Sequence, residues 1–175
     1  MAIAETDLIW RLSGGAANED PAAALGGAMS TAAGGIITKT KTFNSIFDDI
    51  SGAEAAAGDV EYRCIYIHNE HGSLSLTSAK VWIETNTANA KDMIDIALDA
   101  AGKDGTADTI ATEAAAPDPA VTFAHDCIAY ATGLALGDLA AGEGYAIWIR
   151  RTITAGMTAD DDEFFTLKVQ GDTAA

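Results

Sequence analysis

The three histidines are the side chains whose type and spacing come closest to a catalytic or metal-binding pattern. His68 and His71 flank Glu70 in the run His-Asn-Glu-His, which could place two imidazoles near one metal ion at the end of a strand. The run lacks a third ligand and the helical i, i+4 spacing of zinc hydrolases. His125 stands beside Asp126, but neighbours in sequence do not define a triad in space. We therefore expect no catalytic residue and no metal ligand.

Motifs that bind nucleotides or activate a nucleophile are also missing from the sequence. It has neither a Gly-x-Ser-x-Gly turn nor a Gly-x-x-x-x-Gly-Lys-Ser/Thr phosphate loop. The pairs Gly14-Gly15 and Gly26-Gly27 do not stand between a strand and a helix, as a dinucleotide site requires. We expect no cofactor and no enzymatic activity. A small hydrolase is the alternative, and it would need the histidines to converge with carboxylates in a cleft.

Acidic residues dominate the charged side chains and bear on the choice of partner. The formal net charge is −16, from 26 acidic and 10 basic residues, which opposes binding to nucleic acid or anionic lipid. The acid runs Asp48-Asp49 and Asp160-Asp161-Asp162-Glu163 could bind calcium, but they lack the spacing and turn glycine of an EF-hand loop. The acidity is more typical of general solubility.

Two adjacent arginines stand out in this acidic chain. Arg150 and Arg151 follow Trp148 closely, and they could form local salt bridges or anchor the protein to an acidic neighbouring subunit. Aromatic and arginine side chains are enriched at protein interfaces. The candidate interface residues are Trp10, Arg11, Leu25, Trp148, Arg150 and Arg151.

Short segments with period-two alternation must position these residues. The strongest is Val60–Asn69, whose even-numbered and odd-numbered side chains face opposite sides of a strand. Further strands are predicted over Asp7–Leu12, from Ile36, over Leu74–Thr77, Ala79–Thr85, Met93–Leu98, Leu134–Leu139, Tyr145–Ile153 and Phe164–Val169. No amphipathic crossover helix separates them, so the fold class is all-β, an antiparallel β-sandwich of the jelly-roll type. Glu54–Asp59 is predicted as a connector.

The segment Ser13–Gly35 consists almost entirely of small and polar residues and predicts an extended arm. Because it cannot bury enough apolar surface alone, we expect it to lie along a neighbouring subunit. The predicted organisation is therefore an N-terminal strand and arm over 1–35 and a β-sandwich domain over 36–175. Cys64 and Cys127 lie among apolar residues and are predicted to be buried, reduced thiols.

The start of the sequence has no basic region followed by a long apolar run, and no stretch of 18 apolar residues occurs. We therefore expect a protein that is synthesised in the cytoplasm and does not span a membrane.

Five blocks of sequence carry a likeness that extends over nearly the whole chain. They are Asp7-Leu-Ile-Trp-Arg-Leu-Ser-Gly-Gly-Ala-Ala-Asn, Ala24-Leu-Gly-Gly, Phe47-Asp-Asp-Ile-Ser-Gly-Ala-Glu, Gly58-Asp-Val-Glu-Tyr-Arg-Cys-Ile-Tyr-Ile and Leu139-Ala-Ala-Gly-Glu-Gly-Tyr-Ala-Ile-Trp-Ile-Arg-Arg. In these blocks the chain resembles small structural proteins of the virion that tailed phages and prophages encode.

The resemblance implies a capsid decoration (cement) protein on the outer surface of the phage head. Its partners would be the major capsid protein and further copies of itself, as a homotrimer that bridges capsomers. The acidic surface agrees with this expectation, since an outer protein does not contact packaged DNA. A tail, neck or fibre-associated location is an alternative. So is a carbohydrate-binding or host-binding module, which an exposed aromatic cluster around Trp82, Trp148 and Tyr145 would favour.

Overall fold

The structure is a computed structural model that describes residues 2–38, 44–117, 121–158 and 163–173. This part of the chain forms ten strands and one short α-helix. The strands are β1 (Leu8–Leu12), β2 (Gly26–Gly27), β3 (Ile36–Ile37), β4 (Asp59–Asn69), β5 (Leu76–Thr85), β6 (Asp92–Lys103), β7 (Ala107–Thr109), β8 (Leu134–Leu139), β9 (Gly144–Ile153) and β10 (Thr166–Thr173), and the helix is α1 (Gly52–Ala57). No helix among these residues is long and apolar enough to span a bilayer.

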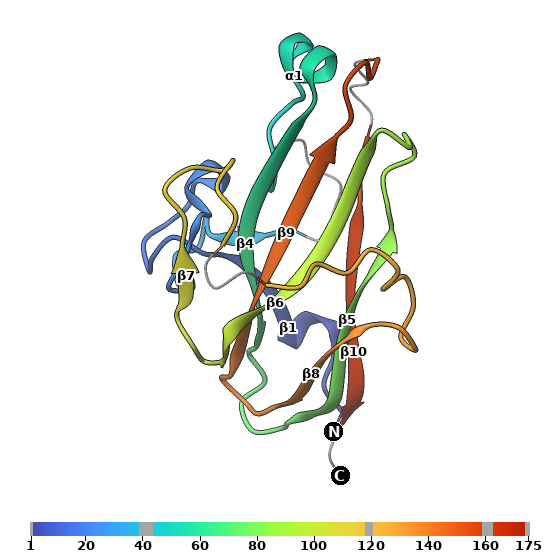
Figure 1. The fold of residues 1–175 in the computed structure, drawn as a ribbon. Coiled ribbons are helices and arrows are strands. Elements are labelled where there is room, and N and C mark those ends of the chain that lie inside the picture. The colour runs from blue at the N-terminus through green and yellow to red at the C-terminus, as the bar shows by residue number, and fades with distance from the viewer. Residues whose placement is uncertain (1, 39–43, 118–120, 159–162, 174–175) are drawn as a thin grey trace.

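Two antiparallel sheets pack against each other across the main hydrophobic core (Figure 1). The larger sheet has the strand order β3-β1-β4-β9-β6, the smaller has the order β10-β5-β8, and β2 and β7 form a separate pair. The all-β, antiparallel class and its sandwich-like arrangement are thereby confirmed. The finer assignment to the jelly-roll type stays a prediction.

Strand β4 is buried on both faces in its middle part, where residues 64–67 are apolar on both sides. Ile65 and Ile67 point into the core between the sheets, and they pack there with residues of β5, β8 and β9. Cys64 and Tyr66 point to the opposite side, where they form a second core with Trp148 of β9. The predicted alternation along β4 is therefore confirmed. Both cysteines are free and buried, as the sequence predicted.

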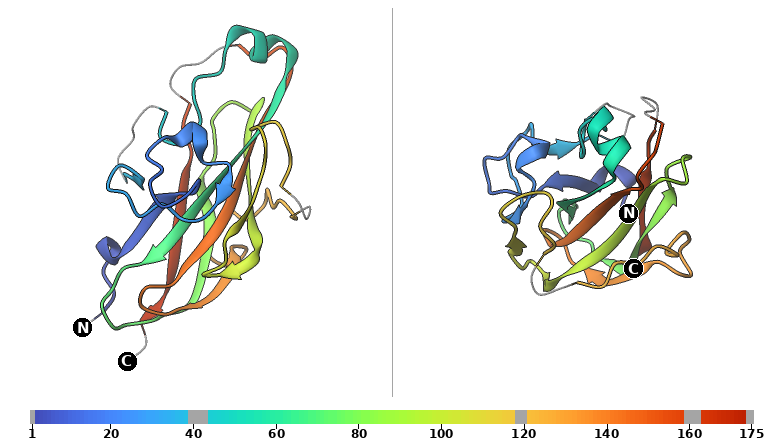
Figure 2. Two further views of the ribbon diagram at one scale, coloured as in Figure 1. Left: turned by 90° about the vertical axis from the view of Figure 1, so that its left-hand side faces the viewer. Right: turned by 45° about the horizontal axis from the view of Figure 1, so that its top comes forward.

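The second core is covered by segment 13–35, together with residues near β7 (Figure 2). Its backbone bonds directly to the strands: the Cys64 amide donates to the Ala24 carbonyl (2.8 Å), and the Ile110 amide donates to the Leu25 carbonyl (3.0 Å). The Tyr66 hydroxyl donates to the Gly27 carbonyl (2.8 Å). The prediction of an extended arm was wrong. Small residues here allow close backbone approach within the same chain, which satisfies polar groups that β4 would otherwise leave open.

Gly26 shows how tight this approach is. Its φ is +91°, and an added Cβ would lie 1.7 Å from the Asp108 carbonyl oxygen. Only glycine fits such a position. Residues 1–35 also contribute β1, which lies between β3 and β4 in the larger sheet, so this stretch and the rest of the chain share one fold.

Two connections differ from the sequence prediction. Residues of the predicted connector form α1, because the Ser51 side chain accepts from the Glu54 amide and the Glu54 carboxylate accepts from the Ser51 amide in a capping box. Strands β4 and β5 are consecutive in sequence but belong to different sheets, so the intervening turn carries the chain from one layer to the other.

Strand β10 is an edge strand of the smaller sheet. It pairs with β5 on one side and has no strand partner on the other among the residues described. Its register shifts twice, between Thr166 and Leu167 and between Gln170 and Asp172. These irregularities bend the edge and interrupt its ladder.

Candidate partner-binding groove

A groove of about 640 Å³ opens between the sheets, bordered by β1 and β3 of the larger sheet and by β10 of the smaller. Its apolar lining comes from five separate stretches of the chain: Leu8, Trp10, Ile37, Ile46, Phe47, Ile50, Ile65, Ile94, Phe164, Phe165, Leu167 and Val169. The volume and the mixture of apolar walls with a few polar groups are typical of binding sites.

Phe47 organises one side of this groove. Its ring lies 6.4 Å from that of Phe165, centroid to centroid, in a tilted arrangement. The guanidinium carbons of Arg63 and Arg151 lie 5.5 and 4.7 Å from the Phe47 ring centroid. Two cations therefore share one aromatic side chain, which favours a single ring position. Phe165, Leu167 and Val169 pack against the core as their alternation predicted.

Arg151 and Glu61 form a buried ion pair next to Phe47. The Arg151 Nε donates to Glu61, and its Nη1 donates to the Asp48 carbonyl oxygen (2.8 Å). Burial raises the pKa of Glu61, while the Arg151 charge opposes that rise. The positive charge of Arg151 is thus paired with a carboxylate of the same chain, and Arg63 is likewise paired with Glu113.

Asp92 is the group in the groove with the most perturbed acidity. Its side chain is 3% exposed, and burial raises its pKa to about 6; nearby Arg151 opposes the rise and Glu163 adds to it. Its Oδ1 atom is buried and has no hydrogen-bond partner. The Thr166 hydroxyl oxygen, also in the groove lining, is buried and unpartnered as well. Such atoms are uncommon in native proteins.

In the described part of the chain, carboxylates gather in two groups that could hold a metal ion, and both include Glu61. One group joins Asp48, Glu61 and Glu113, and the other joins Glu54, Asp59 and Glu61. In the first, arginines already neutralise Glu61 and Glu113. Of the predicted acid run 160–163, only Glu163 is among the residues described, and its carboxylate accepts from the amides of Ala88 and Asn89 at 2.7 and 2.9 Å. It caps a loop.

His68 and His71 make separate sets of hydrogen bonds. His68 contacts Glu70 and the Gly142 carbonyl oxygen, whereas the Nδ1 of His71 accepts from the amides of Ser73 and Leu74. His71 therefore closes the turn after β4.

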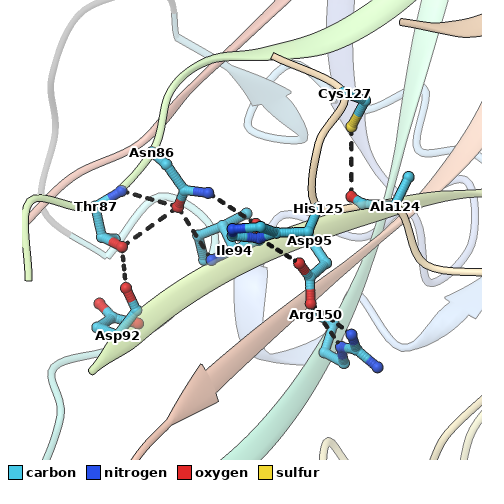
Figure 3. A network of polar contacts seen from close by, with 9 residues as sticks. All are labelled: Asn86, Thr87, Asp92, Ile94, Asp95, Ala124, His125, Cys127 and Arg150. Carbon is cyan, nitrogen blue, oxygen red and sulfur yellow. Dashed lines mark hydrogen bonds and ion pairs between the residues drawn. The ribbon is translucent and has the colours of Figure 1, made fainter. Parts of the chain in front are cut away.

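His125 forms a different arrangement with Asp95 and Arg150 (Figure 3). The imidazole Nδ1 lies 2.8 Å from one oxygen of buried Asp95, and the Arg150 guanidinium donates to the other. A histidine oriented by a carboxylate is part of a catalytic triad, but a triad also needs a nucleophile bonded to the second ring nitrogen. No hydroxyl or thiol among the described residues hydrogen-bonds to His125, and the neighbouring Cys127 donates to the Ala124 carbonyl oxygen instead.

The predicted interface residues fall into three environments. Trp10 and Arg151 line the groove. Arg11 pairs with Glu70, Arg150 pairs with Asp95, and Leu25 packs partly buried on the second core. Trp148 is fully buried and donates from its indole nitrogen to Asp99 (2.7 Å), so it offers no surface to a partner. The sequence analysis did not predict Asp92, Phe47 or the residues of β10 as part of a site. They are far apart in sequence and come together at the groove only in the folded chain.

Aromatic side chains do not form the exposed platform that a carbohydrate-binding module would present around Trp82, Trp148 and Tyr145. Trp82 and Trp148 are buried, and Tyr145 is half-buried against the main core. Trp82 packs edge-on against Tyr130, with ring centroids 5.9 Å apart.

No protein-family model, curated protein or solved structure matches the chain at a significant level. The chemistry of the groove is therefore the main guide to function. Its apolar walls, paired arginines and unpartnered acceptors suit the binding of another molecule.

Proposed function

We propose that the chain is a non-enzymatic structural protein of a tailed-phage particle, which binds the outer surface of the head as a decoration (cement) protein. The observation that carries the proposal is the apolar groove beside the edge strand β10. It provides a recess in which a segment of another protein can bury apolar side chains and pair with a strand edge.

Three further features support the proposal. The sequence blocks quoted above resemble virion proteins of tailed phages, and the net charge of −16 suits a protein that stays away from DNA. The packed antiparallel sheets, with buried cores on both faces of β4, supply a rigid scaffold for a stabilising role. The partners in this proposal are the major capsid protein and two further copies of the chain.

The direct test is to add the purified protein to heads of its own phage that lack it. We expect saturable binding to the outer surface in cryo-electron images and greater resistance of the heads to heat. Phe164→Ser should weaken binding, because Phe164 lines the groove and is 46% exposed. Ile128→Ser is the matched control, since Ile128 is an exposed apolar residue (63%) outside the groove lining. Labelled protein found on the tail or neck, or equal effects of the two variants, would overturn the proposal.

A further inference from the structure

Two buried oxygen atoms in the lining of the groove have no hydrogen-bond partner. Asp92 is 97% removed from solvent, given its 3% exposure, yet its Oδ1 has no hydrogen-bond partner, and the same holds for the Thr166 Oγ1. Both residues line the groove. Leaving a buried acceptor unpaired costs roughly as much as a whole hydrogen bond provides, so these atoms indicate a donor that arrives from outside.

The surroundings of Asp92 fix it in place. The Thr87 hydroxyl donates to the Asp92 carbonyl, while Asn86 bonds to both the amide and the carbonyl of Ile94, at 3.1 and 3.0 Å (Figure 3). The backbone at Asp92 and Ile94 is therefore held by Asn86 and Thr87, which restricts the positions open to the Asp92 carboxylate before any partner binds.

The charge of the groove favours a cation. Among the described residues, six acidic side chains line it, Glu5, Asp48, Asp49, Glu84, Asp92 and Glu163, against the two basic residues Arg151 and Lys168. Those two are already paired, Arg151 with Glu61 and Lys168 with Glu84. A positively charged group of a bound partner would experience a net negative potential in the groove. Because the walls are apolar, electrostatic attraction there is stronger than in water.

The geometry of β10 favours an extended polypeptide. Its inner pairing is to β5, and its other edge has no strand partner in the described part of the chain. Residues 163–169 also line the groove, so the open edge and the apolar recess form one continuous surface. A segment in β-conformation can pair with such an edge and place alternate side chains in the recess.

Building on the proposed decoration function, we propose that the groove binds an extended segment of the partner protein that carries a lysine, with its main chain paired to β10 and its ammonium group donating to Asp92 Oδ1. Lysine fits better than arginine, because its compact ammonium on an apolar stem matches a narrow recess with isolated acceptors. The Thr166 hydroxyl can accept a second hydrogen bond from the same ammonium.

A fluorescent pentapeptide, acetyl-Val-Val-Lys-Val-Val-amide, is the probe. Its binding to the full chain is measured by anisotropy, beside peptides with norleucine or glutamate in place of lysine. We expect the lysine peptide to bind about tenfold or more tightly than the norleucine peptide, which is the usual effect of one charged hydrogen bond. A peptide with alternate backbone amides methylated should lose a similar factor, because it cannot pair with β10. Equal binding of the lysine and norleucine peptides, or no binding at millimolar concentration, overturns the inference.

Substitutions in the protein provide the second arm. Asp92→Asn should weaken the lysine peptide about tenfold and leave the norleucine peptide unaffected. Asp172→Asn is the matched control, since it removes the same charge from an exposed position on β10 outside the groove lining. Thr166→Val tests the second acceptor. Thermal melting confirms that each variant is folded. Equal effects of Asp92→Asn and Asp172→Asn overturn the role of Asp92.

The head-binding assay separates this inference from the proposed function. Heads that bind wild type and Asp92→Asn equally would overturn the lysine contact and leave the decoration function standing. Lysine-dependent peptide binding, with no affinity for heads, would overturn the decoration function and leave the groove assignment standing.

Discussion

The two faces of the larger sheet differ in how completely they are covered. On the outer face, segment 13–35 and the residues around β7 cover β4 and β9, and the buried Trp148 indole and Tyr66 hydroxyl both have hydrogen-bond partners. On the inner face, the end beside β10 stays open as the groove. The buried side-chain polar atoms without a hydrogen bond, among the residues described, belong to Arg63, Asp92, Arg151 and Thr166, all of which line this groove or the small pocket beside Phe47.

The chain therefore covers the outer face of the sheet with its own segment 13–35, which is rich in small residues. Part of the inner face stays uncovered at the groove. A covered face should lose stability when its parts are removed. An open face should tolerate substitution, and the removal of an unpaired charge there should even stabilise the isolated protein. Four substitutions test this difference between the covered and the open face.

The largest effect should come from Trp148→Ala on the covered face. It removes a fully buried indole and leaves Asp99 Oδ2 without its donor, so we expect a loss of about 4 kcal/mol in the free energy of unfolding. Urea unfolding monitored by circular dichroism measures it. A loss smaller than that of Phe164→Ser in the groove would contradict the contrast between the faces.

Gly26→Ala tests the same face through the backbone. The added methyl group would collide with the Asp108 carbonyl, and φ is positive, so we expect a loss of about 2 kcal/mol or more. Gly15→Ala is the control: its φ of +102° is similar, but an added Cβ would meet nothing within 4 Å. Equal unfolding midpoints for the two variants would show that segment 13–35 is not tightly packed.

Asp92→Asn should act in the opposite direction. The unfolded carboxyl has a pKa near 3.8 and the folded one about 6, so the folded state holds its proton more tightly. The contribution of Asp92 to stability is therefore fully present below pH 4 and declines as pH rises to about 6. At pH 7 we expect the variant to be more stable than wild type by on the order of 2 kcal/mol, and this gain should shrink towards pH 4.

After burial, Arg151 and Glu163 are the charged groups that act on the pKa of Asp92. Urea unfolding of wild type and variant at pH 4 and pH 7 provides the measurement. A pH-independent difference, or a destabilised variant at pH 7, would refute the assignment of Asp92 as an unsatisfied buried acid.

The smallest effect is expected for Arg150→Ala. This arginine is about a third exposed, and Asp95 keeps His125 as a second partner, so the loss should be about 1 kcal/mol or less. Added salt should reduce the difference from wild type. A salt-insensitive loss of several kcal/mol would place Arg150 among the structural residues of the covered face.

The sequence contained enough information for the longer strands, but not for the short strands β2 and β7 or for the groove. Alternation in β4, β9 and β10 follows from local geometry, which is why those strands and their faces were predicted. Segment 13–35 was misjudged, because composition shows that small residues build no core of their own and says nothing about a neighbouring surface on which they can pack. Asp92 directly precedes the predicted strand Met93–Leu98. Its raised pKa depends on burial and then on Arg151 and Glu163, which are distant in sequence.

The open edge of β10 also bears on how the protein behaves at high concentration. Two copies that paired through this edge would leave further edges exposed and could extend into filaments. The two interruptions of its register limit regular pairing to Leu167–Gln170, which suits a short segment better than a whole strand of another copy. The charge of −16 also makes copies repel one another. Salt screens the repulsion between copies but does not change the register of β10. At high salt concentration, resistance to self-association therefore depends on the irregular register of this one strand.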